Sequence, residues 1–381
     1  MTQSPQPSRR ARAWATTMSG HRDADGLVTA HAGGEPRVAP VAPRDRPARE
    51  ALEEQLLQPG ATRARGAGER ERPEQPDPER TCFERDRDRV LHSSAFRRLA
   101  GKTQVFVYPA DHQRTRLTHA LEVAQVATSV SRATGLNVAL TEAIAIGHDC
   151  GHGPGGHASE EAFDAYLPGG YDHAVWGADV VLEPLNLCRQ TLDGIRNHSW
   201  SRPAPATPEG VVVSWADRVA YTAHDLEDAV HTGIVSVEDL PRAVIDVCGC
   251  TRGEQLGAFV GELIRSTTST GVIGMRAEVA EALAALRAFN YERIYTRPDA
   301  IAQSESVVAV LRGLVEHYLD RPDRLPPDFR PPPEAAREDS VHAAVAYVGG
   351  MTDRFAFRTA VRELGWDPAR LPRGIDVPRR R

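Results

Sequence analysis

The chain has 381 residues, a formal net charge of −6 and 41% hydrophobic residues, which suits one large globular domain or two smaller ones. No apolar run is long enough for a transmembrane helix and the N-terminus lacks a signal-like apolar core, so we expect a cytoplasmic protein with no membrane partner. Five scattered cysteines without a CxxC pair indicate reduced thiols rather than a disulfide framework.

The N-terminal segment, residues 1–78, is rich in Arg, Pro, Ala and Gly and shows little apolar periodicity. Such a composition cannot bury enough apolar surface to offset the entropy lost on ordering, so we predict a disordered tail. Its arginines leave nucleic-acid binding open, although a solvated tail is the simpler interpretation.

The rest of the chain is expected to fold. The predicted core, residues 79–322, is helical apart from a short extended piece at 102–109. A proline-rich connector at 323–340 precedes a C-terminal helical segment, 341–381, that we expect to pack on the core. The fold class predicted from this pattern is all-α.

Apolar residues at helical spacing define the expected helices of the core. Gly135 is a natural stop for the second helix, and Thr141 is a candidate N-cap for the third. The predicted helices span residues 83–101, 114–135, 141–149, 157–167, 171–185, 187–198 and 211–230, with several more between 237 and 318.

Histidines and carboxylates concentrate in the stretch GHDCGHGPGGHASE. The adjacent pair His148 and Asp149 places a nitrogen ligand beside a hard oxygen ligand, which suits Mn²⁺, Fe²⁺, Zn²⁺ or Mg²⁺. Two protein ligands do not complete such a site, and His119 upstream and Asp217 downstream are candidates for the others. Asp217 lies in an apolar stretch, where an unpaired carboxylate would be costly. Each residue alone is ordinary, but together the four predict a divalent-metal site.

Two neighbouring features suggest catalysis and anion binding. His157 and Glu160 are three residues apart at the start of a helix, so the carboxylate can orient the histidine for proton transfer. The alternative is a helix cap beside a surface acid. Arg116 precedes His119 by three residues on the same helix face, where it either meets a bound anion or remains a surface arginine.

The helix at 211–230 carries a third polar feature. Asp217, Tyr221 and Asp225 are four residues apart and therefore line one face. An acid–tyrosine–acid face that points inward is either a binding site or a serious misfit. His152 either lines the metal site or supports the glycine turn.

In this order, these residues resemble the HD superfamily of metal-dependent phosphohydrolases, and more narrowly the deoxyguanosine triphosphate triphosphohydrolase family. The phrases that carry the resemblance are FERDRDRVLHSSAFRRLAGKTQVF, RTRLTHALEVAQVA, EAIAIGHDCGHGPGGHASE and WADRVAYTAHDLEDAV. It is strong over residues 83–230 and continues more weakly through NYERIYTRP and YVGGMTDRFA. It implies an HD-domain helical bundle with additional C-terminal helices.

The resemblance also implies a role for each matching residue. The metal ligands would be His119, His148, Asp149 and Asp217. A catalytic histidine, its acidic partner and a further active-site histidine would be His157, Glu160 and His173. Substrate contacts are implied for Gln104 and Asp225 at the sugar 3′-hydroxyl, Tyr221 at the sugar ring, Arg116 at a phosphate, and Lys102.

The implied reaction is metal-dependent hydrolysis of a dNTP, dGTP-like, to deoxynucleoside and inorganic triphosphate, in a family whose members are commonly oligomers. Two residues depart from the usual family pattern, and these departures bear on rate and substrate choice. Gly155 stands where the family usually has Phe, and Ala174 stands where Asn is common. One alternative is an HD phosphohydrolase for another nucleotide phosphoester. The other is a nucleotide or single-stranded DNA sensor without turnover.

Overall fold

The computed structural model describes residues 6–23, 25–33, 37–107, 113–332 and 334–372. The predicted extended piece at 102–109 and the predicted C-terminal segment therefore extend partly outside the described residues. The chain divides into two compact units, Met1–Arg44 and Asp45–Arg381. Among the described residues, strand is confined to a two-stranded pair in the first unit and one isolated bridge in the second. The predicted all-α class is confirmed.

The first unit contains helix α1, Arg9–Thr17, and a hairpin of β1, His21–Arg22, and β2, Val28–Thr29. Ser8 caps α1 by accepting a hydrogen bond from the backbone N–H of Ala11 at 3.1 Å. None of the unit's described residues is buried. These described residues therefore form no hydrophobic core.

Residues 45–78 belong to the second unit, whereas the sequence placed them in the N-terminal tail. Their main element is α2, Arg46–Leu56. Glu53 on this helix accepts hydrogen bonds from the backbone N–H of Ala64 at 2.6 Å and from the Asn137 side chain at 3.1 Å. Polar contacts of this kind leave no apolar periodicity in the sequence, which is why the predicted boundary differs.

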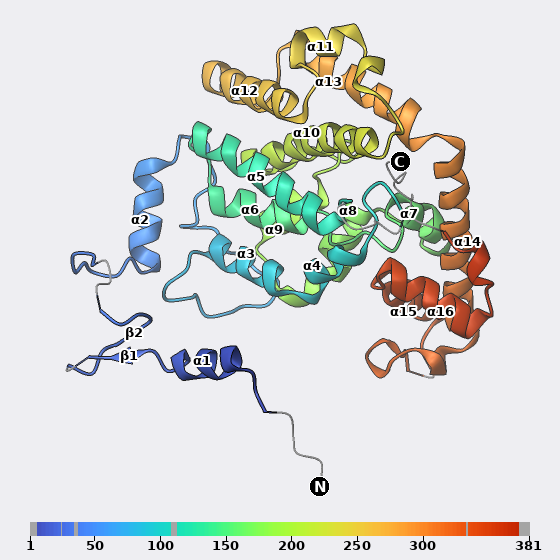
Figure 1. Cartoon of the computed structure of the whole chain (residues 1–381), viewed down its shortest axis with the longest axis horizontal. Coiled ribbons are helices and arrows are strands. Elements are labelled where there is room, and N and C mark those ends of the chain that lie inside the picture. Colours follow the sequence, from blue (N-terminus) through green and yellow to red (C-terminus); the bar gives the residue numbers. More distant parts are fainter. Residues whose placement is uncertain (1–5, 24, 34–36, 108–112, 333, 373–381) are drawn as a thin grey trace. The chain divides into compact units, whose positions relative to one another are not determined.

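The second unit continues as a succession of helices (Figure 1). Its α-helices are α3 Cys82–His92, α4 Ser94–Arg98, α5 Arg116–Thr134, α6 Val138–Gly147, α7 His157–Phe163, α8 His173–Trp176, α9 Arg189–Arg196, α10 Pro208–His231, α11 Arg242–Cys248, α12 Arg252–Thr270, α13 Ala277–Asn290, α14 Pro298–Asp320, α15 Arg337–Gly349 and α16 Asp353–Leu364. Short 3₁₀ or π turns lie at Leu99–Gly101, Asp164–Tyr166, Gly177–Val181, Glu183–Leu185, Val237–Asp239, Tyr291–Tyr295, Pro322–Arg324, Pro327–Phe329 and Pro368–Arg370.

Local signals explain the helix that carries the first predicted ligand. Thr115 and Thr118 form a reciprocal cap at the start of α5, and Gly135, with φ of 68°, ends it as predicted. The next helix differs from prediction: Asn137, not Thr141, is the N-cap of α6. Thr141 is buried, and its hydroxyl donates to the Asn137 carbonyl at 2.9 Å, so it serves packing inside the helix.

Two hydrophobic cores hold the second unit together. The first joins α3, α5, α6 and α10 with the helices α11–α13, and the second joins α7 with α14, α15 and α16. Figure 1 shows α7 beside α14, with α15 and α16 close to the same long helix. The segment from His148 to His157 runs from the first core to the second, so the predicted motif lies between the two cores.

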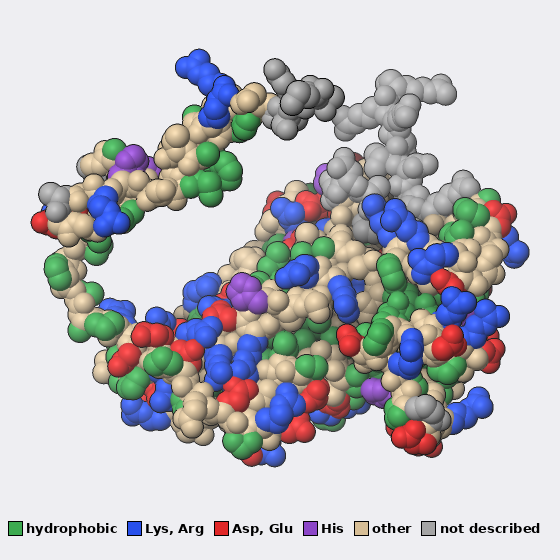
Figure 2. Space-filling view, turned by 90° about the horizontal axis from the view of Figure 1, so that it is seen from below, with side chains coloured by type: hydrophobic (Ala, Val, Ile, Leu, Met, Phe, Trp, Pro, Cys, Tyr) green, Lys and Arg blue, Asp and Glu red, His purple; other side chains and the backbone are tan. Residues whose placement is uncertain are grey.

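Charge is mixed over the face of the second unit that Figure 2 shows, where Lys and Arg side chains are interspersed with Asp and Glu. None of the helices in the described part of the chain has the length and apolarity that crossing a bilayer requires.

Candidate active site

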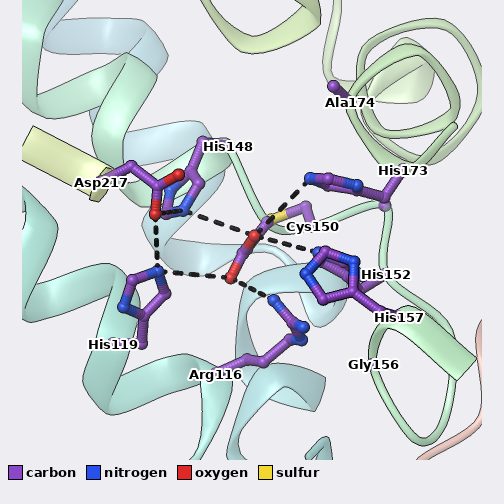
Figure 3. A network of polar contacts seen from close by, with 12 residues as sticks. Arg116, His119, His148, Cys150, His152, Gly156, His157, His173, Ala174 and Asp217 are labelled. Carbon is purple, nitrogen blue, oxygen red and sulfur yellow. Dashed lines mark hydrogen bonds and ion pairs between the residues drawn. The ribbon is translucent and has the colours of Figure 1, made fainter. Parts of the chain in front are cut away.

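The four predicted metal ligands come together from three packed helices. His119 lies on α5, His148 and Asp149 follow α6, and Asp217 lies on α10. His119 Nε2 is 3.0 Å from Asp217 Oδ1 and 3.8 Å from Asp149 Oδ2. His148 Nε2 is 3.4 Å from Asp149 Oδ1 and 3.7 Å from Asp217 Oδ1 (Figure 3). Two imidazole nitrogens and two carboxylates therefore converge on one point.

The chemistry of this cluster fits a divalent metal. His148 Nδ1 donates to the Ala145 carbonyl at 2.6 Å, which leaves Nε2 as the nitrogen with a free lone pair. This Nε2 is buried and has no hydrogen-bond partner among the described residues. Ligand atoms of His119, His148 and Asp217 lie within 4.8 Å of one another. A buried, unpaired acceptor beside carboxylate oxygens is what a metal ligand set provides.

Both carboxylates of the cluster are held in the ionised state that metal binding requires. Burial alone would raise the pKa of Asp149, but the charge of the neighbouring Arg116 outweighs it and lowers the pKa well below its usual value. Burial would also raise the pKa of Asp217, but the hydrogen bond with His119 outweighs this effect and lowers the pKa.

A second cluster surrounds Glu160. Its Oε2 accepts from His157 Nδ1 at 3.0 Å, and its Oε1 contacts His173 Nδ1. Burial would raise the pKa of Glu160, but the hydrogen bonds from His157 and His173 lower it strongly. The His157 side chain is 73% exposed, so its ring stands at the cavity surface while the ionised Glu160 orients it.

The glycine turn places His157 at the start of α7. Gly155 and Gly156 have φ of 72° and 63°, a region that favours glycine. A Cβ on Gly156 would lie 2.8 Å from Arg116 Nη2, so the turn packs directly against that arginine. Ala174, the second departure from the family pattern, is buried on α8 and does not line the cavity.

One cavity of about 500 Å³ connects the two clusters, a volume that suits a small organic ligand. The predicted site residues on its wall are Gln104, Arg116, His119, Asp149, His157, His173, Asp217, Tyr221 and Asp225. His148 and Glu160 do not line this cavity, but Glu160 contacts His157 and His173, which do.

The predicted sugar contacts differ in how far they are already paired. Gln104 Oε1 is buried without a hydrogen-bond partner among the described residues. Asp225 accepts from Arg114 and from the Tyr295 hydroxyl. The Tyr221 hydroxyl accepts from Arg287 Nε at 2.8 Å. Gln104 therefore has an oxygen free for a ligand, whereas Asp225 and Tyr221 are held by neighbours.

The two predicted cationic contacts lie in different places. Arg116 lines the cavity, and its Nη1 donates to Asp149 Oδ2 at 2.8 Å. Lys102 does not line it: its buried Nζ donates to the Gly349 carbonyl at 3.0 Å and to the His152 carbonyl. The structure thus gives Lys102 an internal position that the sequence did not indicate.

Sequence reasoning gave no role to several residues that shape the site. His198 follows α9, and its Nε2 lies 3.2 Å from His173 Nε2. Burial lowers the pKa of His198 to about 3, so this ring is neutral. Arg218 and Arg287 also line the cavity. Arg218 directly follows Asp217, so its position was available as a signal. His198 and Arg287 come from segments without a motif.

The sequence left two positions open for His152, at the metal site or in support of the glycine turn, and its side chain lies beside the predicted ligand Asp149. It is buried, lines the cavity, and its Nε2 lies 3.3 Å from Asp149 Oδ1. Its ring stacks on that of His173, with centroids 3.7 Å apart and planes inclined by 16°. Burial holds its pKa well below the usual value.

The fold and this site define an HD-domain protein: the HD domain matches residues 116–222, and a phosphohydrolase-associated domain matches residues 273–362. A deoxyguanosinetriphosphate triphosphohydrolase-like protein from Caldanaerobacter subterraneus subsp. tengcongensis is 42% identical over 314 residues, covering 81% of this chain and 92% of that protein. Proteins with the same description from Clostridium perfringens and Clostridium tetani are 38% and 35% identical, covering 75% and 74% of this chain and 87% and 85% of theirs.

The chain belongs to the deoxyguanosinetriphosphate triphosphohydrolase-like family of HD phosphohydrolases. The resemblance seen in the sequence is thereby confirmed. Among solved structures, a hypothetical protein from Aquifex aeolicus superposes with a TM-score of 0.42 and 16% identity over 73% of this chain and 71% of that chain. A likeness this distant carries no argument about the site.

Proposed function

We propose that the protein hydrolyses a deoxynucleoside triphosphate at the α-phosphorus: dNTP and water give a deoxynucleoside and inorganic triphosphate. The observation that carries the proposal is the composition of one cavity wall. A metal-type ligand cluster, an acid-oriented histidine and the Gln104, Tyr221 and Asp225 set all reach the same cavity.

His119, His148, Asp149 and Asp217 would hold the divalent metal. When bound, such an ion supplies a Lewis acid for a phosphoryl oxygen and lowers the pKa of water. The buried Arg116 fixes Asp149 through the 2.8 Å hydrogen bond and keeps its carboxylate ionised.

His157 serves as the proton donor to the departing 5′-oxygen. Glu160 accepts from its Nδ1, which leaves Nε2 to carry the proton toward the substrate. His173, bound to the other oxygen of the same carboxylate, holds Glu160 in place. General acid catalysis by a positioned side chain contributes about 10²–10⁴-fold.

The remaining polar side chains match the two ends of a nucleotide. Arg116, Arg218 and Arg287 line the cavity and offset the negative charge of a triphosphate. By the family pattern, Gln104 and Asp225 would hydrogen-bond a sugar 3′-hydroxyl, and Tyr221 would pack on the sugar ring where a 2′-hydroxyl would be crowded. Asp225 would make this contact in addition to its bonds with Arg114 and Tyr295. This set favours a deoxynucleotide over an alarmone or a ribonucleotide.

The proposal is tested by incubating the protein with Mn²⁺ or Mg²⁺ and each dNTP, singly and in pairs, and separating the products by chromatography. Deoxynucleoside with intact triphosphate supports it and ranks the bases. Monophosphate with diphosphate contradicts it. Turnover only of nucleoside monophosphates or cyclic nucleotides would favour another HD phosphohydrolase, and binding without turnover a sensor.

A further inference from the structure

Asp353 connects the C-terminal helices to the cavity wall. It is the first residue of α16, and it is only 1% exposed. Its Oδ2 accepts from the backbone N–H of Thr103 at 3.0 Å and from the Thr103 hydroxyl at 2.5 Å. Its Oδ1 accepts from the backbone N–H of Gly155 at 2.8 Å. One carboxylate thus ties together two segments that lie far apart in the sequence.

Both segments carry residues of the cavity. Thr103 precedes Gln104 and pairs with Thr115, at the start of the helix that carries Arg116. Gly155 lies two residues before His157, in the glycine turn. The distance between the substrate wall and the proposed proton donor is therefore set through Asp353.

A second cross-link joins the same parts of the chain. Lys102 donates from Nζ to the His152 carbonyl, in the glycine turn, and to the Gly349 carbonyl at the end of α15. The backbone carbonyl of Lys102 also accepts from the N–H of Arg116 at 3.2 Å. The glycine turn is thus fastened to α15 and α16 by one buried base and one buried acid.

The turn has little freedom to move on its other side. A Cβ on Gly155 would lie 2.4 Å from Val307 Cγ1, so α14 closes against the turn. A buried carboxylate is costly unless its lone pairs are satisfied, and an apolar residue would fill the same core space. Three donors on two active-site segments explain why a carboxylate stands here.

We propose that Asp353 is a positioning residue for the reaction, which holds the Gln104 segment and the His157 turn in register. This inference rests on the proposed function only for the substrate used in the rate measurement. It gives the phosphohydrolase-associated domain, which matches residues 273–362, a direct part in the geometry of the HD site.

The test compares Asp353→Asn and Thr103→Val with the control Thr352→Ala in the full-length protein. The amide in Asp353→Asn has one acceptor oxygen and turns an NH₂ toward one of the N–H donors, so at least one bond is lost. Thr103→Val removes only the hydroxyl donor. Thr352 caps α16 by accepting from Phe355 N at 3.4 Å and packs beside Gly101, so Thr352→Ala weakens the same helix but leaves the three hydrogen bonds of Asp353 in place.

Three quantities are measured: metal content, amide hydrogen exchange over residues 102–104 and 150–157, and kcat/KM. We expect Asp353→Asn to keep its metal, to exchange about tenfold faster in both segments, and to lose about 10- to 100-fold in kcat/KM. Thr103→Val should show a smaller change of the same kind. The control should lower the melting temperature alone.

Unchanged exchange and kcat/KM in Asp353→Asn would overturn the inference. So would a control that reproduces the same changes, because these would then follow from stability. The exchange measurement needs no substrate, so it decides the role of Asp353 even if the wild-type protein releases no triphosphate. That second result would count against the proposed function alone.

Discussion

At the scale of single residues, His148 and His157, which lie on either side of the glycine turn, differ in their surroundings. His157 stands exposed at the cavity, whereas His148 is fully buried among the predicted ligands. The two histidines come from one stretch of sequence, yet their surroundings suit opposite tasks. A ligand needs a free lone pair, and a proton donor needs access to the substrate.

His157→Ala is therefore expected to keep its metal and lose about 10²- to 10⁴-fold in kcat, the usual contribution of a positioned general acid. Metal content is read by elemental analysis and kcat by product release. Asp149→Ala is the matched variant, which should lose metal and activity together. Loss of metal from His157→Ala would contradict this division of roles.

Lys102 gives a pH-dependent prediction, because burial lowers its pKa from 10.5 to about 8. Between these two values the unfolded chain still holds a proton that the folded protein has released. The free energy of unfolding should therefore rise with pH across this window, by about 3 kcal/mol in all. Below pH 8 the ammonium is charged in both states and the gain is absent.

Urea unfolding of the wild type and of Lys102→Met between pH 7.5 and 10.5 isolates this contribution, because all other titrating groups are shared. The rise should be missing from the variant. Equal slopes for the two proteins would mean that folding does not lower the pKa of Lys102.

At the scale of elements, the glycine turn is the segment on which the site depends most. Gly155 replaces the Phe that is usual in the family, and the structure explains why a side chain is excluded here. Its φ is 72°, and a Cβ would lie 2.4 Å from Val307. The departure thus reflects close packing of α14 against the turn, rather than a looser turn.

Gly155→Ala should destabilise the protein by more than the roughly 1 kcal/mol that positive φ alone imposes, and it should also lower kcat because His157 shifts. Gly169→Ala is the control, since Gly169 has φ of 88° with open space around a Cβ. Comparison of melting temperatures and kcat isolates the contact with Val307. Equal effects of the two substitutions would contradict this explanation.

Elements also show what sequence pattern reveals and what it leaves out. The end of α5 at Gly135 follows from the chain's local preference for a left-handed residue there. The cap of α6 was misplaced at Thr141, because a threonine inside a helix can bond to its own backbone as well as cap. Such choices are decided by neighbours in space.

In the site, too, the sequence reveals residue types and spacing but not contacts between distant segments. His119, His148, Asp149 and Asp217 were found together because metal ligands need particular residue types at compatible positions. Arg287, on α13, could not be found, because nothing local distinguishes an arginine that lines a cavity from one in water. The family resemblance implies a substrate contact for Lys102, yet its side chain turns into the interior, away from the cavity.

At the scale of the whole molecule, the chain divides after Arg44 rather than at residue 78. None of the described residues of the first unit is buried, whereas residues 45–78 hydrogen-bond the core through Glu53 and Thr62. The disorder predicted for residues 1–78 therefore remains a prediction for residues 1–44 only.

Deletion of residues 1–44 should leave the melting temperature and kcat/KM within error of the wild type. Deletion of residues 1–78 should lower the melting temperature by several degrees, because polar groups of the core lose their partners. Scanning calorimetry and a rate assay check both. Strong destabilisation by the shorter deletion would mean that the first unit contributes to the fold after all.

Cleavage between the 5′-oxygen and the α-phosphorus is tested most directly by hydrolysis of dGTP in H₂¹⁸O with Mn²⁺. Mass spectrometry of the products should find one ¹⁸O in the inorganic triphosphate and none in the deoxyguanosine. Label in the deoxyguanosine would mean attack at the 5′-carbon, and labelled diphosphate or monophosphate would mean a different phosphorus. Either result would contradict the role proposed for His157.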